Sequence, residues 1–216
     1  MSVIFPKWTN HLPTIAAAAA VLGGVFVVTF VSYYFSPRHT DVGYAPEQPI
    51  PYSHRLHAGA MAMDCRYCHT AVEQGPHANV PTTETCMNCH KTVRTESPYI
   101  QELTAAHEAG LPVRWEKVHL LPDYAYFNHA VHVNANVGCA SCHGRMDQME
   151  VVRQAEPLSM GWCLECHRNP GPHVRPEGVA VTQMDWEPTA ESIAAADALV
   201  NSGALNPPEH CSACHR

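Results

Sequence analysis

The chain has 216 residues and a formal net charge of −7, from 13 basic and 20 acidic residues. So low a basic content argues against nucleic acid as a partner, because phosphates need clustered Lys and Arg side chains. A basic protein partner is favoured instead. The 10 cysteines restrict the chemistry to disulfides, zinc sites or covalently attached haem.

The first predicted element is a membrane span. Residues 15–35 form an uncharged, largely apolar stretch. As a helix at about 1.5 Å per residue it is roughly 30 Å long, which matches the hydrocarbon core of a bilayer. The alternative is a cleaved signal peptide, whose apolar region usually has about 7–15 residues. We therefore expect a cytoplasmic N-terminus at residues 1–13 and an uncleaved transmembrane helix at residues 14–36.

All the cysteines lie in Cys-x-x-Cys-His motifs, which we number pentads 1 to 5 in chain order. They are Cys65-Arg-Tyr-Cys68-His69, Cys86-Met-Asn-Cys89-His90, Cys139-Ala-Ser-Cys142-His143, Cys163-Leu-Glu-Cys166-His167 and Cys211-Ser-Ala-Cys214-His215. This motif attaches haem c: both thiols form thioethers along one porphyrin edge, and the histidine becomes the proximal iron ligand. Zinc requires no histidine after every second cysteine. The sequence therefore predicts five haem c groups.

The pentads fall into repeated modules. Tyr52-x-His54-x-x-His57 precedes pentad 1, and Phe127-x-His129-x-x-His132 precedes pentad 3. This repetition predicts two-haem modules at 52–91 and 127–168 and a single-haem tail at 185–216. Because haem is attached covalently outside the cytoplasm, residues 37–216 are expected to form a periplasmic pentahaem domain.

Regular structure should be sparse in this domain. The chain has 18 prolines, and only residues 98–109 and 189–203 have the caps and periodicity of longer helices. Each pentad should form a short helical turn. Roughly 36 residues for each haem are too few for an ordinary core. We expect a multihaem cytochrome c fold, mostly irregular, with short α-helices packed on five haems and one N-terminal transmembrane α-helix.

The second axial ligand decides between electron transfer and catalysis, because an iron with two protein ligands mainly moves electrons. The candidates for distal ligands are His54, His57, His119, His129 and His132, with His77, Met149 and Met160 as weaker ones. A His-x-x-His pair on one helical turn can serve two haems and hold them close together. A methionine ligand would raise the potential of its haem. No residue is expected to be catalytic.

Longer segments resemble known families. The two-haem modules are similar to class III multihaem cytochromes. Residues 42–59, 64–69, 85–90, 121–129 and 158–168 resemble the pentahaem cytochrome c subunit of bacterial alternative complex III, a quinol:electron-acceptor oxidoreductase. The resemblance implies a membrane complex with an iron–sulfur subunit similar to molybdopterin oxidoreductases, polytopic quinol-binding membrane subunits and a monohaem cytochrome c.

The expected function is electron transfer within such a complex. The chain would relay electrons from quinol oxidation through five haems to a periplasmic carrier or a terminal oxidase. One alternative is a self-contained, single-span multihaem quinol dehydrogenase that feeds periplasmic reductases and needs one iron with an open or weak sixth position. Another is a pentahaem nitrite reductase. This is disfavoured because those enzymes have a lysine-ligated haem, whereas all five motifs here end in histidine.

Overall fold

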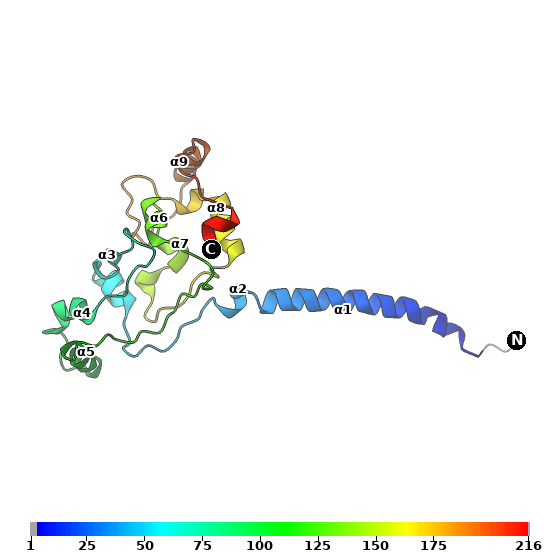
Figure 1. Cartoon of the computed structure of the whole chain (residues 1–216), viewed down its shortest axis with the longest axis horizontal. Coiled ribbons are helices and arrows are strands. Elements are labelled where there is room, and N and C mark those ends of the chain that lie inside the picture. The colour runs from blue at the N-terminus through cyan, green and yellow to red at the C-terminus, as the bar shows by residue number, and fades with distance from the viewer. Residues whose placement is uncertain (1–3, 216) are drawn as a thin grey trace. The chain divides into compact units, whose positions relative to one another are not determined.

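The computed structural model describes residues 4–215 and divides into two compact units, Met1–Thr40 and Asp41–Arg216 (Figure 1). Residues 1–3 of the predicted N-terminus lie outside the described residues. Unit 1 contains the 3-10 helix η1 (Lys7–His11) and the α-helices α1 (Leu12–Tyr34) and α2 (Pro37–Thr40).

The helix α1 matches the predicted membrane span, although it begins and ends two residues earlier. Pro13 lies in its first turn, where a missing backbone N–H costs nothing. None of its residues is buried within the protein. Among the described residues, the segment Lys7–Tyr34 is the one that is long and apolar enough to cross a membrane.

Unit 2 is built from short helices joined by irregular segments. They are the π-helix η2 (Arg55–Ala60), α3 (Cys65–Cys68), α4 (Thr83–His90), α5 (Pro98–Glu108), α6 (His129–Asn134), α7 (Ala140–His143), η3 (Met146–Gln148), α8 (Met160–Arg168), η4 (Gly171–His173), α9 (Ala190–Asn201) and α10 (Cys211–Cys214). Residues 4–215 contain no β-strand, and two isolated bridges join Ala125 to His215 and Val137 to Val174. The prediction of a largely irregular domain with short helices is confirmed.

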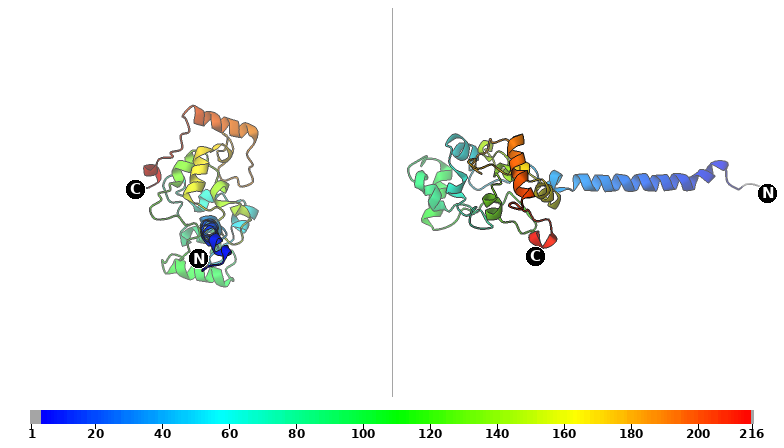
Figure 2. Two further views of the ribbon diagram at one scale, coloured as in Figure 1. Left: turned by 90° about the vertical axis from the view of Figure 1, so that its right-hand side faces the viewer. Right: turned by 90° about the horizontal axis from the view of Figure 1, so that it is seen from above.

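The two longest helices of unit 2 lie where the sequence predicts them. The helix α5 begins after Ser97 with Pro98 in its first turn, and Gly110 follows its end with φ +65°. A glycine adopts this left-handed conformation without strain. The helix α9 begins with a capping box between Thr189 and Ser192. Figure 2 shows α5 and α9 at opposite edges of unit 2 in its left-hand view.

Every pentad forms helical structure, as predicted. In pentads 1, 3 and 5 the histidine N–H donates to the carbonyl of the first cysteine, for example from His69 to Cys65 at 2.9 Å. In pentads 2 and 4 the histidine is part of the longer helices α4 and α8. One turn of helix therefore fixes each histidine ring relative to the two thiols.

Unit 2 has a thin apolar core. The buried hydrophobic residues are Ile50, Met87, Leu103, Val118, Met149, Val174, Val181 and Ala196. The accessible surface of the chain is 14869 Å², whereas a compact chain of this mass exposes about 9,800 Å². The exposed helix α1 accounts for part of the excess. The remaining excess of accessible surface indicates that the polypeptide of unit 2 buries too little of its own surface to form an ordinary core.

Candidate functional site

The ten thiols are all free, and eight of them are partly buried. Burial raises the pKa of the thiols at Cys65, Cys68, Cys86, Cys139, Cys142, Cys163 and Cys166. For Cys142 it raises the pKa to about 12, with the thiols of Cys166 and Cys163 adding to the shift. These surroundings suit an uncharged sulfur such as a thioether. Zinc ligands and nucleophilic cysteines need the thiolate instead.

The pentad histidines are oriented by backbone carbonyls. The Nδ1 atom of His69 lies 2.7 Å from the Asn79 carbonyl, that of His90 3.1 Å from Val93, that of His167 2.6 Å from Pro208 and that of His215 3.0 Å from Tyr124. A carbonyl oxygen only accepts hydrogen bonds, so Nδ1 carries the proton and Nε2 keeps its lone pair. A metal-binding histidine uses this tautomer and this kind of hydrogen bond to a backbone carbonyl.

The two His-x-x-His segments repeat the same local geometry. His57 Nδ1 donates to the carbonyl of residue 53 at 2.9 Å, and His132 Nδ1 to that of residue 128 at 2.8 Å. His57 stacks on Tyr52 at 4.4 Å between ring centroids, and His132 on Phe127 at 4.5 Å. The aromatic residue ahead of each segment therefore supports the second histidine, and Nε2 is again left as the acceptor.

Three pairs of imidazole rings are spaced as two ligands of one metal would be. The centroids are 6.2 Å apart for His57 and His90, 6.1 Å for His132 and His167, and 6.3 Å for His129 and His143. Two imidazoles bound on opposite sides of one metal, with metal–nitrogen distances of about 2.0–2.1 Å, place their centroids about 6.3–6.5 Å apart. Each pair joins a pentad histidine to a predicted distal candidate.

His54 and His119 are placed differently. The Nδ1 atom of His54 is buried without a hydrogen-bond partner. Burial lowers the pKa of His54 to about 4, and the charge on the His69 ring contributes more to this shift than the charges on His57 and His119. The Nε2 atom of His119 lies 3.2 Å from Nδ1 of His143. The Nδ1 atom of His143 therefore faces the His119 ring, whereas the Nδ1 atom of each of the other four pentad histidines faces a backbone carbonyl.

The weaker distal candidates are not brought into such pairs. His77 and Met160 are exposed. Met149 is buried, with its methyl group beside Gly144. The ring next to His215 is that of Tyr124, 5.8 Å away. Within residues 4–215, no three His, Cys, Asp or Glu side chains gather as they would around a bare metal ion.

Arg175 is a buried residue beside pentad 3 that sequence reasoning missed. It is 3% exposed, its guanidinium lies 4.9 Å from the centre of the Trp186 ring, and Nε and Nη1 have no hydrogen-bond partner. It packs on Gly138, where any Cβ would overlap the guanidinium. Burial lowers its pKa. A lone arginine between Val174 and Pro176 gives no sequence signal of this position.

Gln154 is a second residue that sequence reasoning missed. Its side chain is fully buried. Its Oε1 accepts a hydrogen bond from the Leu120 N–H at 3.1 Å, and its Nε2 donates to the Glu156 carbonyl at 3.0 Å. Its backbone is also bonded to Gly43 and Tyr44. Because Leu120 follows His119, this amide fixes the segment that carries that histidine.

No family model matches the chain. The menaquinone reductase multihaem cytochrome c subunit of Nitratidesulfovibrio vulgaris is 36% identical over 98 residues, which are 45% of this chain and 46% of that protein. The chain thus spans about half the length of this relative. Over that part, it is similar to a multihaem cytochrome c subunit.

Proposed function

We propose that this chain carries five haem c groups on its pentads and transfers electrons between them. The observation that carries the proposal is the set of three imidazole pairs, each formed by a pentad histidine and an upstream histidine at 6.1–6.3 Å. When bound, each haem supplies one-electron chemistry at its iron. The polypeptide supplies thiols, oriented imidazoles and partial cover from water.

We propose His57, His129 and His132 as distal ligands opposite His90, His143 and His167. We propose the same role for His54 opposite His69, because its Nδ1 atom is buried without a hydrogen-bond partner and His129 faces His143 in the matching position of the second module. An iron held by two imidazoles has no open position, so it exchanges electrons without binding a substrate. His54 and His57, like His129 and His132, are one turn apart, so each segment brings two haems together.

The helix α1 is the proposed anchor, with residues 37–216 on the outer side of the membrane, where haem is attached. The chain would act as an electron-transfer subunit of a quinone-linked complex, as its resemblance to alternative complex III implies. Its partners would be an iron–sulfur subunit, polytopic quinol-binding subunits and a monohaem cytochrome c. Electrons would pass from quinol oxidation to a periplasmic carrier or a terminal oxidase.

The relative supports a second candidate for the direction of flow. Its name, menaquinone reductase, favours electrons that enter the outer domain and leave toward quinone. The same row of haems serves either direction, since potentials and partners decide which way electrons move.

The number of haems, the spin state of the irons and the reactivity with quinol test the proposal. Intact mass and the pyridine haemochrome spectrum of the purified chain should give five covalent haems, and low-temperature EPR should show at least four low-spin irons. Free thiols in the mature chain would overturn it. Detergent-purified chain without partners should stay oxidised when mixed with a menaquinol analogue. Its rapid reduction would favour the self-contained quinol dehydrogenase instead.

A further inference from the structure

We propose that the five haem sites form one unbranched row in the spatial order of pentads 2–1–3–4–5, and that pentads 2 and 5 are its two ends, where electrons enter and leave. This inference rests on the proposed function. This spatial order differs from the order of the pentads along the chain, and a contact between each pair of neighbouring pentads supports it.

Pentads 2 and 1 are joined directly. The Nδ2 atom of Asn88, within pentad 2, donates to the hydroxyl of Tyr67, within pentad 1, at 3.0 Å. The π-helix η2 makes a second link, because its His57 faces His90 of pentad 2 and η2 ends at Ala60, five residues before Cys65 of pentad 1. Pentads 1 and 2 are therefore first neighbours.

Pentads 1 and 3 are joined through residues 181–182. The Thr182 hydroxyl donates to Asp64, the residue before Cys65, at 3.0 Å. The carbonyl of Val181 accepts from the backbone N–H of Cys139 at 3.0 Å. Two consecutive residues thus hold the first cysteines of pentads 1 and 3 side by side. This contact crosses between the two predicted modules.

Pentads 3 and 4 share the helix α6. His129 faces His143 of pentad 3, and His132, three residues further along α6, faces His167 of pentad 4. The third and fourth sites are therefore neighbours in the same way as the first two.

Pentads 4 and 5 are joined by the segment that leads into pentad 5. The carbonyl of Pro208 accepts from His167 Nδ1 at 2.6 Å. The carboxylate of Glu209 pairs with Arg168 at 2.8 Å. Both residues lie within three positions of Cys211, so the tail is attached to pentad 4.

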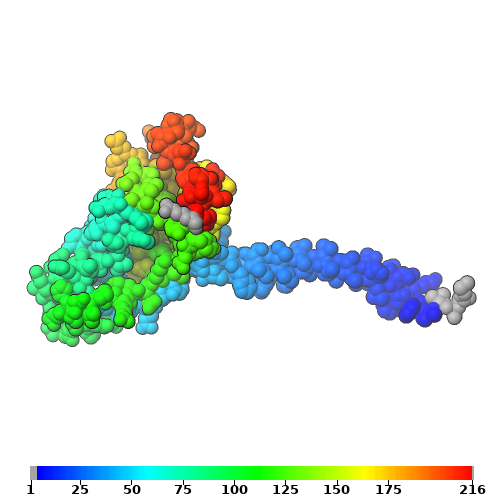
Figure 3. Space-filling model, viewed as in Figure 1, coloured from blue at the N-terminus to red at the C-terminus, as the bar shows by residue number. Residues whose placement is uncertain are grey.

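Exposure marks the two ends of this row. Cys89 in pentad 2 and Cys211 in pentad 5 are the exposed members of the ten cysteines. Figures 1 and 3 show the segment around α4 and the C-terminal segment at opposite sides of unit 2, with α3 and α7 between them in Figure 1.

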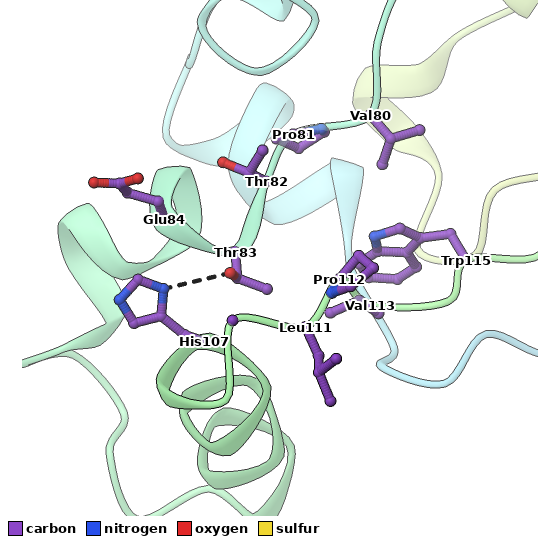
Figure 4. A pocket seen from close by; sticks show the side chains of 11 residues that line it. Val80, Pro81, Thr82, Thr83, Glu84, His107, Leu111, Pro112, Val113 and Trp115 are labelled. Atoms are coloured by element: carbon purple, nitrogen blue, oxygen red, sulfur yellow. Dashed lines mark hydrogen bonds between the residues drawn. The ribbon is translucent and has the colours of Figure 1, made fainter.

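The pentad 2 end also has an open cavity of about 480 Å³. It lies between α4, α5 and residues 110–115, and Thr83 and His107 are hydrogen-bonded to each other at 3.3 Å in its wall (Figure 4). Glu84 from α4 and the half-buried ring of Trp115 also line it. A partner can therefore approach this end of the row closely.

The spatial order is tested by locating the irons in the full haem-loaded chain. Anomalous diffraction at the iron edge, with each iron assigned to its pentad, should make 2–1, 1–3, 3–4 and 4–5 the four shortest iron–iron separations. A shorter separation between pentads 2 and 3 would overturn the order. Five haems in another order would overturn this inference alone, whereas missing haems would overturn the proposed function.

The ends are tested by charge reversal at exposed carboxylates. Glu84 lies in α4 beside pentad 2, and Asp123 precedes Tyr124, whose carbonyl orients His215. Stopped-flow oxidation of the reduced, haem-loaded chain by a basic soluble cytochrome c at low ionic strength should slow several-fold in Glu84→Lys or in Asp123→Lys. Glu177→Lys, an exposed control on another loop, should leave the rate unchanged. Equal slowing by all three variants, or by none, would overturn the assignment of the ends.

Discussion

Replacing Gln154 by leucine should destabilise unit 2 through two named hydrogen bonds. The substitution keeps the side chain's size but removes the acceptor of the Leu120 N–H and the donor to the Glu156 carbonyl. Losing these bonds at a fully buried position costs about 2–3 kcal/mol. For a domain of this size that corresponds to a fall in melting temperature of about 4–12 °C.

The assay is thermal unfolding of the haem-loaded chain in detergent, followed by circular dichroism in the far ultraviolet. The matched control is Gln148→Leu, because Gln148 is exposed on η3. An exposed substitution of this kind should change stability by less than about 0.5 kcal/mol. The EPR signal of the haem on pentad 3 gives a second readout, since a displaced Leu120 moves the neighbouring His119 away from His143.

The reasoning is refuted if Gln154→Leu and Gln148→Leu melt within a degree of each other. An unchanged melting temperature would mean that the buried amide does not hold these segments together. A lower melting temperature with an unchanged pentad 3 signal would separate the two parts of the argument. Gln154 would then stabilise the fold without positioning His119.

Three further substitutions test other contacts. His132→Ala should convert one low-spin iron to high spin in the EPR spectrum, whereas His77→Ala should change nothing; equal spectra for both would contradict the ligand assignment. Arg175→Met should lower the midpoint potential of the pentad 3 haem by about 30–60 mV, a three- to tenfold loss of electron affinity, because a buried positive charge favours the reduced iron; an unshifted redox titration would contradict this. Arg66 lowers the pKa of Asp64 to about 2, so the ionised carboxylate contributes stability above pH 4 that is lost as the pH falls from about 4 to 2. Asp64→Asn should remove that acid sensitivity, worth at most about 1 kcal/mol for this partly exposed pair, and urea unfolding at pH 5 and pH 2.5 measures it.

The sequence predicts those features of the fold that depend on neighbouring residues. The helices at 98–109 and 189–203, the helical pentads and the apolar helix near the N-terminus all follow from caps, spacing or composition within one segment. The sequence also singles out the histidines of the two His-x-x-His segments, because three-residue spacing and the preceding aromatic residue recur in both modules. Their role as iron ligands stays a prediction.

Long-range contacts could not be predicted in this way. Pentads 1 and 3 are held together by hydrogen bonds to Thr182 and Val181. These two residues are far from both pentads in the sequence and belong to no distinctive motif. The carbonyls that orient His167 and His215 belong to Pro208 and Tyr124, and a backbone oxygen has no sequence signature. Arg175 belongs to no motif, and its burial beside pentad 3 is what distinguishes it from other arginines.

In the proposed periplasmic domain, these carbonyls would set the order in which the haem sites are completed. His69 and His90 are oriented by Asn79 and Val93, which emerge within about ten residues of them. His167 must wait for Pro208, close to the end of the chain, and His215 returns to Tyr124. The first two sites would therefore be complete soon after export, whereas the fourth would stay incomplete until almost the last residue has been exported. A chain truncated before Pro208 would complete the sites of pentads 1 and 2 but would lack the carbonyl that orients His167 in pentad 4.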